Sequence, residues 1–397
     1  MMNRLSKSLA ALLLALLLAL GITGASAEVL LRAGGSFGFA VDAKGVIWGW
    51  GDNTKGQLGN GSKKRQYQPA PAGLGLDGSQ IADIQCGNEN TLFLMKDGTV
   101  YTSGPNNSGQ QGVADAPSYV YEPIRVEGLE NIVQIATGFG QCLARTADGQ
   151  VYAWGRNNLG QAGIGKKGNV KTPVLLDLAG IVDIQCGGKF CMAMDADGNI
   201  WGWGDNESGQ LLEASKGGAV TSPTLLSISG RFTKVACGGS TAFGLDAAGV
   251  LWAWGKNDYG QMGTDDVRQS SSEPVRVELP EGLEITQIHA YNAHSAVVTA
   301  EGQVYQWGRT YSGQLGNGTR PTRSLPTLAC PEEAPVVEAA TGSSCTYVLL
   351  TDGTIRTSGY SEVGQTGAFP TSKGYISTWQ NPGLNLYEGT WVDLGNK

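Results

Sequence analysis

One segment recurs seven times along this chain of 397 residues, and each copy carries a glycine-centred motif of the form W-G-x-N-x-x-G-Q-x-G, with local departures. The first glycine of the motif stands at Gly51, Gly104, Gly155, Gly204, Gly255, Gly308 and Gly359, so successive copies lie 49 to 53 residues apart. A unit of that length cannot hold a core of its own and must stack on its neighbours. The repeats therefore predict a single domain whose units share apolar faces.

Each copy divides into four short segments with strand character. The first is an apolar alternation such as Ile81 to Gly87, and the second ends at an Asp-Gly turn such as Asp97-Gly98, a dipeptide that favours hairpins. The third has bulky residues two apart, as in Trp201 and Trp203, and the fourth contains a proline, which is confined to strand starts and sheet edges. The copies therefore predict an all-β, seven-bladed β-propeller of four-stranded antiparallel blades, with the fourth strand at the rim.

The amino terminus differs from the repeats. A short basic stretch precedes an apolar run from Leu9 to Leu20, and Ala25-Ser26-Ala27 follows. This order is typical of a secretory signal peptide, and an uncleaved anchor is the weaker alternative because the run is shorter than the ~20 residues that span a bilayer. We expect a signal peptide at residues 1–27, a propeller domain at 28–397, and a protein that is secreted or held in the cell envelope without membrane insertion.

The motifs resemble a known repeat family over essentially the whole of residues 28–397. The string of Cys-Gly, an apolar strand, Asp-Gly, Tyr-x-Trp-Gly-x-Asn and Gly-Gln is similar to the repeat of the regulator of chromosome condensation family, whose fold is a seven-bladed propeller. In design the chain is also similar to exported members such as the propeller-type beta-lactamase inhibitor proteins. The family's best-known activity, nucleotide exchange on a small GTPase, is a further implied function, although export argues against it because such GTPases are intracellular.

Three features depart from the pattern of the copies. Ser103 and Ser358 replace the motif tryptophan, and the last copy lacks the proline at the usual distance, so we expect these two blades to pack more loosely. The tail from Trp391 to Leu394 has strand character, and we expect it to pair near the start of the domain and fasten the ring.

Composition argues against several function classes. Without residues 1–27 the chain has 28 − 2 = 26 Lys and Arg against 35 Asp and Glu, and a net charge of −9 makes nucleic acid a poor partner. The two histidines, His289 and His294, have no Cys or His partner at zinc spacing, and no catalytic template fits the chain. We therefore expect no metal, no cofactor and no enzyme activity, with an extracellular enzyme or carbohydrate-binding propeller as the alternative.

Seven cysteines are an odd number for an exported chain. We expect most of them to remain reduced and buried, because several occupy a repeat position that needs only a small apolar side chain. A local bridge between Cys186 and Cys191 stays open as an alternative.

Binding is expected where the copies differ, because residues shared by all copies are best explained as structural. Repeats present parallel loops around a rim, and aromatic side chains there can anchor a protein partner. The candidate residues lie in the loops joining first and second strands: Phe37, Glu89, Phe139, Lys189, Phe190, Tyr291, Asn292 and His294. A second set occupies the motif loops: Leu159, Tyr259, Tyr311 and Tyr360. The sequence thus predicts an exported, monomeric, non-enzymatic protein-interaction module.

Overall fold

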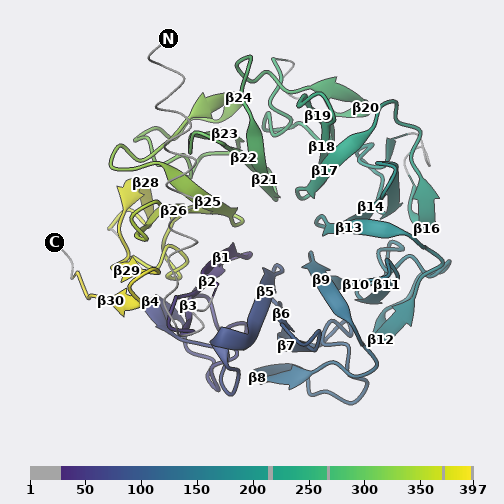
Figure 1. Cartoon of the computed structure of the whole chain (residues 1–397), viewed down its shortest axis with the longest axis horizontal. Helices are drawn as coiled ribbons and strands as arrows, with labels where there is room; N and C mark the ends of the chain where they lie inside the picture. The colour runs from purple at the N-terminus through teal and green to yellow at the C-terminus, as the bar shows by residue number, and fades with distance from the viewer. Residues whose placement is uncertain (1–27, 213–217, 266–268, 369–371, 395–397) are drawn as a thin grey trace, which may run out of the picture.

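A computed structural model describes residues 28–212, 218–265, 269–368 and 372–394. These residues form seven four-stranded antiparallel sheets, which stand around a central axis as the blades of a propeller (Figure 1). In each blade the strands follow one another from the axis to the rim in chain order. The predicted seven-bladed all-β propeller is confirmed, whereas the predicted signal peptide at 1–27 lies outside the described residues.

The strand bounds repeat with the blades. The first strands are β1 (Leu30–Ala33), β5 (Ile81–Cys86), β9 (Ile132–Thr137), β13 (Ile181–Cys186), β17 (Phe232–Cys237), β21 (Ile285–Tyr291) and β25 (Val336–Thr341). The second strands are β2 (Phe37–Val41), β6 (Thr91–Met95), β10 (Gln141–Thr146), β14 (Phe190–Asp195), β18 (Thr241–Asp246), β22 (His294–Thr299) and β26 (Cys345–Leu350). The third strands are β3 (Ile47–Gly51), β7 (Val100–Pro105), β11 (Val151–Gly155), β15 (Ile200–Gly204), β19 (Leu251–Gly255), β23 (Val304–Gly308) and β27 (Ile355–Tyr360).

The fourth strands are β4 (Gln66–Pro71), β8 (Tyr119–Arg125), β12 (Val170–Leu175), β16 (Val220–Leu225), β20 (Ser271–Arg276), β24 (Arg323–Leu328) and β28 (Tyr375–Gln380). Among the described residues each is paired in a sheet with the third strand of its blade alone, and in β28 Thr378 also forms an isolated bridge with Asn317. The first six contain the prolines expected there: Pro69, Pro123, Pro173, Pro223, Pro274 and Pro326. A proline suits this position because it has no N–H to donate to a neighbouring strand. The prediction of an edge strand is confirmed.

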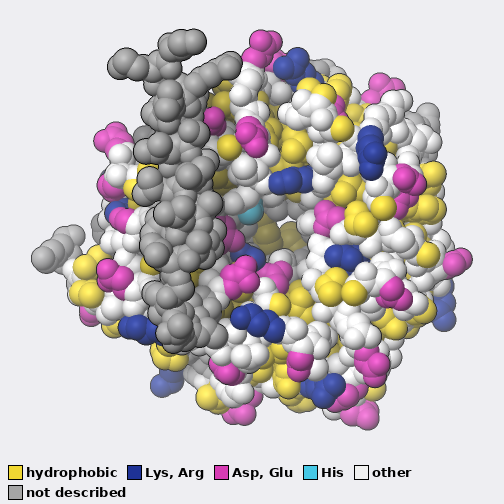
Figure 2. All heavy atoms as spheres, in the orientation of Figure 1, with side chains coloured by type: hydrophobic (Ala, Val, Ile, Leu, Met, Phe, Trp, Pro, Cys, Tyr) yellow, Lys and Arg dark blue, Asp and Glu magenta, His cyan; other side chains and the backbone are white. Residues whose placement is uncertain are grey.

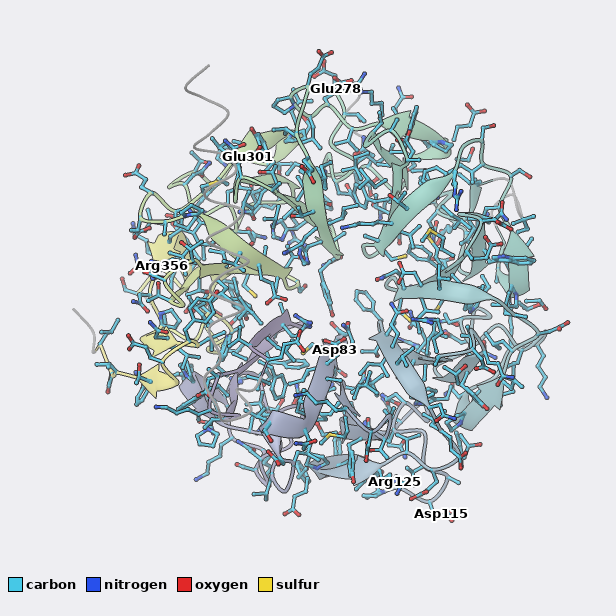
Figure 3. All side chains as sticks on the ribbon, viewed as in Figure 1. Asp83, Asp115, Arg125, Glu278, Glu301 and Arg356 are labelled. Carbon is cyan, nitrogen blue, oxygen red and sulfur yellow. The ribbon has the colours of Figure 1, made fainter. Side chains whose placement is uncertain are left out.

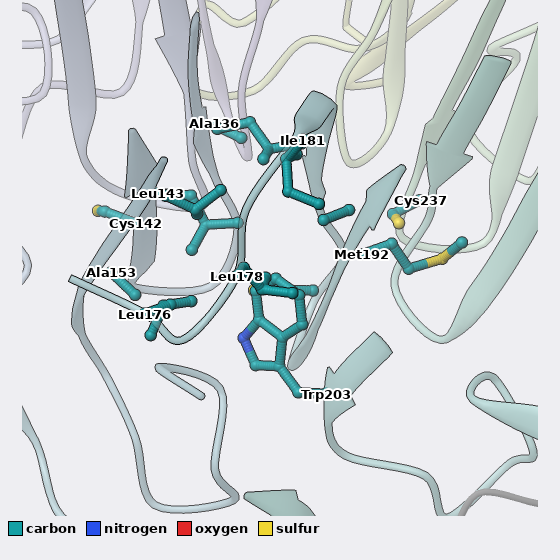
Figure 4. Close-up of a cluster of buried hydrophobic side chains, with 14 of the residues drawn as sticks. Ala136, Cys142, Leu143, Ala153, Leu176, Leu178, Ile181, Met192, Trp203 and Cys237 are labelled. Atoms are coloured by element: carbon teal, nitrogen blue, oxygen red, sulfur yellow. The ribbon is translucent and has the colours of Figure 1, made fainter. Parts of the chain in front are cut away.

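The tryptophan of the third strand joins its blade to the preceding one. In four blades the buried indole Nε1 donates to the carbonyl of the motif glutamine one blade earlier: Trp154 to Gln110 at 3.1 Å, Trp203 to Gln161 at 2.8 Å, Trp254 to Gln210 at 3.0 Å and Trp307 to Gln261 at 2.8 Å. Figure 4 shows Trp203 beside Leu178 of the preceding linker, in a core that continues from blade to blade. The apolar seams are therefore shared, as the repeat length requires.

The two blades without the tryptophan are filled in another way. Ser103 Oγ and Ser358 Oγ are buried and still reach the glutamine carbonyls of Gln57 and Gln314, at 3.1 and 2.8 Å. In the last blade Trp379 of β28 occupies the missing indole's place, because it lies against Gly316 as Trp307 lies against Gly263. The expected loose packing is therefore wrong at this position of the seventh blade, and for the second blade it stays a prediction.

The ring closes between the seventh blade and the first without a shared strand. The tail forms a small hairpin of β29 (Leu384–Asn385) and β30 (Thr390–Trp391), whose strands pair with each other. The expected pairing of the tail with a strand near the start of the domain is therefore wrong. Leu384 and Leu386 are buried in the seam. The Leu386 carbonyl accepts from Ala43 N at 2.8 Å, whereas in the second blade the equivalent Lys96 N donates to the linker residue Gln80 at 2.8 Å. The tail thus replaces the linker that precedes the first strand in other blades.

A short 3-10 helix, η1 (Gly78–Gln80), lies in the linker before the second blade. Across the part of the chain that the structure describes, no helix is long and apolar enough to cross a membrane.

Candidate functional site

The loops divide between the two faces of the ring. First and third strands of a blade run in the same direction, so the loops that follow them emerge on one face, which we call the signature face. The opposite face carries the tight turns between second and third strands and the linkers between blades. The candidate binding residues all belong to loops of the signature face or to the strand ends beside them.

The motif residues shape the loops of this face. The first glycine of each motif has a φ between 90° and 120°, and a Cβ at Gly155 would lie 2.2 Å from the Gly140 carbonyl. Asn157 Oδ1 accepts from Ala162 N at 2.9 Å, and Gln161 Oε1 accepts from Leu159 N at 2.7 Å. The structural explanation of these shared residues is confirmed.

Three predicted partner-binding residues are unavailable to a partner. Phe37 and Phe190 are 0% exposed and His294 is 1% exposed, because the first residue of a second strand turns into the seam between blades. His294 Nε2 lies 3.0 Å from Gln306 Oε1, and burial lowers the pKa of its imidazole to about 4. Their assignment to a binding surface is wrong, since all three belong to the core.

The other five predicted residues lie at the surface or at the mouth of the central cavity. Lys189 is exposed, and Glu89 forms an ion pair with Lys55 of the first blade. Asn292 has a φ of 54°, and its carbonyl accepts from Gly239 N at 2.7 Å, so its backbone links two blades. Phe139 and Tyr291 are partly exposed.

Phe139 and Tyr291 come from the third and sixth blades and meet across the axis, with ring centroids 6.0 Å apart. The position of Tyr291 is glycine in the other six blades: Gly34, Gly87, Gly138, Gly187, Gly238 and Gly342. Its hydroxyl is buried and has no hydrogen-bond partner among the described residues. The two rings therefore narrow the cavity at its signature-face end.

The central cavity has a volume of about 320 Å³ and is lined by the first strands of all seven blades and by the loops after them. Figure 2 shows the hollow at the centre of the ring, with basic and acidic side chains around it. The volume is at the lower end of small-ligand sites, which measure roughly 300–1,000 Å³. Its wall is polar, and a charged network crosses it.

Arg32 holds that network together. Its Nη2 lies 2.8 Å from Asp83 Oδ1, and its Nη1 pairs with Glu338, so one guanidinium joins blades 1, 2 and 7. Figure 3 shows Asp83 beside the centre of the ring. Burial alone would lower the pKa of Arg32, but the charges of Asp83 and Glu338 outweigh this effect, so the net pKa is raised. Burial raises the pKa of Glu338 despite the charge of Arg32. Asp83 and Glu338 both form ion pairs with the Arg32 guanidinium, so we interpret this network as a structural contact between the blades at the closing seam.

His289 and Asp183 stand elsewhere on the cavity wall. His289 Nε2 lies 3.1 Å from Gln287 Oε1, and burial, aided by the charge of Arg32, lowers its pKa to about 4. Burial raises the pKa of Asp183, although Gln134 donates to it at 2.6 Å. Among the residues that the structure describes, no group of three or more His, Cys, Asp or Glu could hold a metal ion.

The signature face carries a cluster of tyrosine and arginine side chains at the fifth to seventh blades. This tyrosine–arginine cluster consists of Tyr259, Arg309, Tyr311, Arg320 and Tyr375. The Tyr259 and Tyr311 rings lie edge to face at 6.3 Å, with the Arg309 guanidinium carbon 5.4 and 5.9 Å from their centroids. The Arg320 guanidinium carbon lies 4.0 Å from the Tyr375 ring centroid. Tyr311 is 49% exposed, and in the described ranges neither arginine pairs with a carboxylate.

The fold and these loops define a class: a closed propeller with glycine-rich motif loops on one face. The model of the RCC1-like domain matches residues 75–392, and the regulator of chromosome condensation (RCC1) repeat matches residues 44–94. The chain therefore belongs to the family of RCC1-like domains.

Similar proteins and a similar solved structure support this family assignment. The chain is 29% identical to the ultraviolet-B receptor UVR8 of Arabidopsis thaliana over 348 residues, which are 85% of this chain and 78% of the receptor. It is 36% identical to the X-linked retinitis pigmentosa GTPase regulator of Mus musculus over 295 residues, which are 73% of this chain but 29% of the regulator. Human WBSCR16 superposes with a TM-score of 0.73 at 27% identity, covering 80% of this chain and 85% of that structure.

Proposed function

We propose that this protein is an exported, non-enzymatic interaction module that binds a protein partner through its signature face. The observation that carries the proposal is the tyrosine–arginine cluster. Tyrosine and arginine are enriched among residues that dominate binding energy at protein interfaces. Here the rings hold the guanidinium groups in place before a partner arrives, which lowers the entropy cost of ordering them.

The position of the cluster supports a protein partner more than a small ligand. It joins motif loops of neighbouring blades on the rim of the face, where a flat partner surface can cover it together with Lys189 and Glu89. Within the described part of the chain the two guanidinium groups have no carboxylate partner, although Arg320 Nε donates to the Tyr311 carbonyl at 2.7 Å. They suit carboxylates of a partner, because arginine can donate two parallel hydrogen bonds to one carboxylate.

Export rests on the amino-terminal apolar run, and it places the partner outside the cytoplasm. The propeller-type beta-lactamase inhibitors combine the same design with export, so a folded protein of the envelope or medium is the partner class we propose. The protein is proposed to act as a monomer.

The test compares two matched double variants. Arg309→Ala/Tyr311→Ala removes one arginine and one tyrosine from the signature face, and Arg356→Ala/Tyr387→Ala removes the same pair elsewhere, where Tyr387 lies against Gly353 of an opposite-face turn. Tyr311 and Tyr387 are similarly exposed, at 49% and 42%. Proteins captured from the source organism's envelope and medium are identified by mass spectrometry, and the affinity of each purified candidate is then measured by calorimetry.

A specific partner should bind the wild type and the opposite-face variant equally, and the signature-face variant at least tenfold more weakly, which is about 1.4 kcal/mol. Circular dichroism confirms that both variants are folded. Equal affinity for both variants would exclude the cluster as the anchor.

A further inference from the structure

Two thiols of the fourth blade face each other beside the central cavity. Cys186 at the end of β13 and Cys191 in β14 are directly opposite in the antiparallel register, and their Sγ atoms lie 3.5 Å apart. Gly187 N donates to Phe190 O at 2.8 Å, so the adjacent cysteine pair is a non-hydrogen-bonded pair. Such pairs have Cα atoms roughly 4.5 Å apart, and disulfides span Cα separations of roughly 4.4–6.8 Å. A bond between these thiols therefore needs only side-chain rotation.

The other six blades lack this pairing. At the same two register positions they have Ala33/Gly38, Cys86/Thr91, Thr137/Cys142, Cys237/Ala242, Ala290/Ser295 and Thr341/Thr346. Cys86 and Cys237 thus occupy the place of Cys186 without a thiol opposite. Cys86 and Cys237 therefore serve as controls, because each has the position of Cys186 but no second thiol to react with.

The two thiols differ in access. Cys186 is partly exposed and lines the central cavity, whereas Cys191 is fully buried, with its Sγ 3.4 Å from the Gln161 carbonyl. A small molecule that enters the cavity therefore reaches Cys186 first, and Cys191 is placed to react second.

We propose that Cys186 and Cys191 form a thiol–disulfide exchange site whose substrate is a low-molecular-weight disulfide. The Cys186 thiolate attacks one sulfur of the disulfide RSSR, forming a mixed disulfide and releasing RS⁻, which takes up the proton that Cys186 lost. The Cys191 thiolate then attacks Cys186 Sγ, releasing a second RS⁻, which takes up the proton of Cys191. The site loses two electrons to RSSR, so one RSSR yields one protein disulfide and two RSH.

The bond fixes the loop between the two strands. Gly187, Gly188 and Lys189 would then be held between linked strand ends on the signature face. All seven cysteines are free thiols in this structure, which therefore corresponds to the reduced form. This proposal is independent of any partner.

The test uses the folded full chain and hydroxyethyl disulfide, followed by quenching and labelling with N-ethylmaleimide after denaturation. We expect the number of labelled cysteines to fall from seven to five. Lys189 lies between the two cysteines, so trypsin places them on separate peptides that only the new bond holds together. Cys191→Ser should stop at the mixed disulfide, a 2-hydroxyethylthio group on Cys186, and Cys86→Ser or Cys237→Ser should still form the linked peptides.

Three results would overturn the proposal: seven labels retained after treatment, Cys186 linked to Cys237 instead, or a bond that forms only when denaturant is added before the oxidant. Near-UV circular dichroism of each serine variant before treatment establishes that it is folded, and the cysteine-to-serine controls at equivalent positions separate the pair's chemistry from general thiol exposure.

Discussion

At the scale of single residues, the same few side chains make the same contacts in blade after blade. The motif tryptophan donates to the glutamine carbonyl of the preceding blade, and the first blade is the exception. There Tyr347 of the seventh blade donates its hydroxyl to Gln365 O and packs edge to face on Trp50, at a centroid distance of 5.3 Å. Trp50 Nε1 consequently has no hydrogen-bond partner among the described residues.

This exception provides a measurement of the inter-blade hydrogen bond. Trp254→Phe and Trp50→Phe remove the same volume from buried sites, but only the first leaves the Gln210 carbonyl without its indole donor. We expect Trp254→Phe to lower the free energy of unfolding by about 1–2 kcal/mol more than Trp50→Phe, since an unsatisfied buried acceptor costs that much. Urea denaturation of both variants checks the difference, and equal losses would mean that the bond contributes nothing net.

The sequence predicted some candidate site residues well and others badly, for physical reasons. Phe37, Phe190 and His294 look like loop aromatics because they follow a turn, but the first side chain of each second strand points into a seam. The other copies gave no warning, because Asn90 and Gln141 occupy the same position and are polar, as surface residues are, yet both are buried. The meeting of Phe139 and Tyr291 across the axis depends on ring geometry, which no spacing along one chain reveals.

At the scale of elements, the strands follow from local patterns. Asp-Gly turns, alternating apolar residues and edge prolines are local signals for the strands of a blade, which explains why four strands could be predicted in each of the first six repeats; the seventh lacks the proline, and its fourth strand was predicted from the repeat alone. A strand was predicted in the tail as well, at Trp391 to Leu394, but its partner was not, because β29 and β30 have two residues each and their pairing leaves little pattern in the sequence. Their position is decided by a gap elsewhere: the first blade has no linker from a preceding blade.

The hairpin should therefore contribute strongly to stability. Leu384→Ala/Leu386→Ala empties two buried sites in the seam, and we expect a loss of roughly 4–10 kcal/mol, because each buried Leu→Ala substitution costs about 2–5 kcal/mol. Tyr387→Ala/Val392→Ala changes exposed residues of the same tail and should cost less than about 1 kcal/mol. Chemical denaturation compares the two variants, and similar losses would show that the tail does not close the ring.

At the scale of the whole molecule, burial keeps two histidines neutral at pH values where the same histidines are protonated in the unfolded chain. His289 and His294 have a pKa of about 4 in the folded protein against an ordinary value of 6.5. Between these two values the unfolded chain binds protons that the folded chain does not. Stability should therefore fall as the pH drops from about 6.5 to 4, by at most about 1.4 kcal/mol per pH unit for each histidine. The raised pKa values of Asp183 and Glu338 act in the opposite direction, since the folded chain holds those protons more tightly.

The double variant His289→Gln/His294→Gln isolates the histidine contribution, because the carboxyl groups remain. We expect its free energy of unfolding to depend less steeply on pH between 6.5 and 4 than that of the wild type, even if it is less stable throughout. Denaturation at several pH values measures both slopes, and parallel profiles would contradict the burial of neutral histidines.

The tail that takes the place of a linker has a topological consequence. The polypeptide behaves as a cyclic object that is cut once, between the seventh and first blades, and its non-covalent contacts there do the work that a peptide linker does elsewhere. The fold itself does not require the chain termini to lie at this seam rather than at another linker between blades. A circularly permuted chain, rejoined at this seam and opened at another linker, would present the same faces and the same axis.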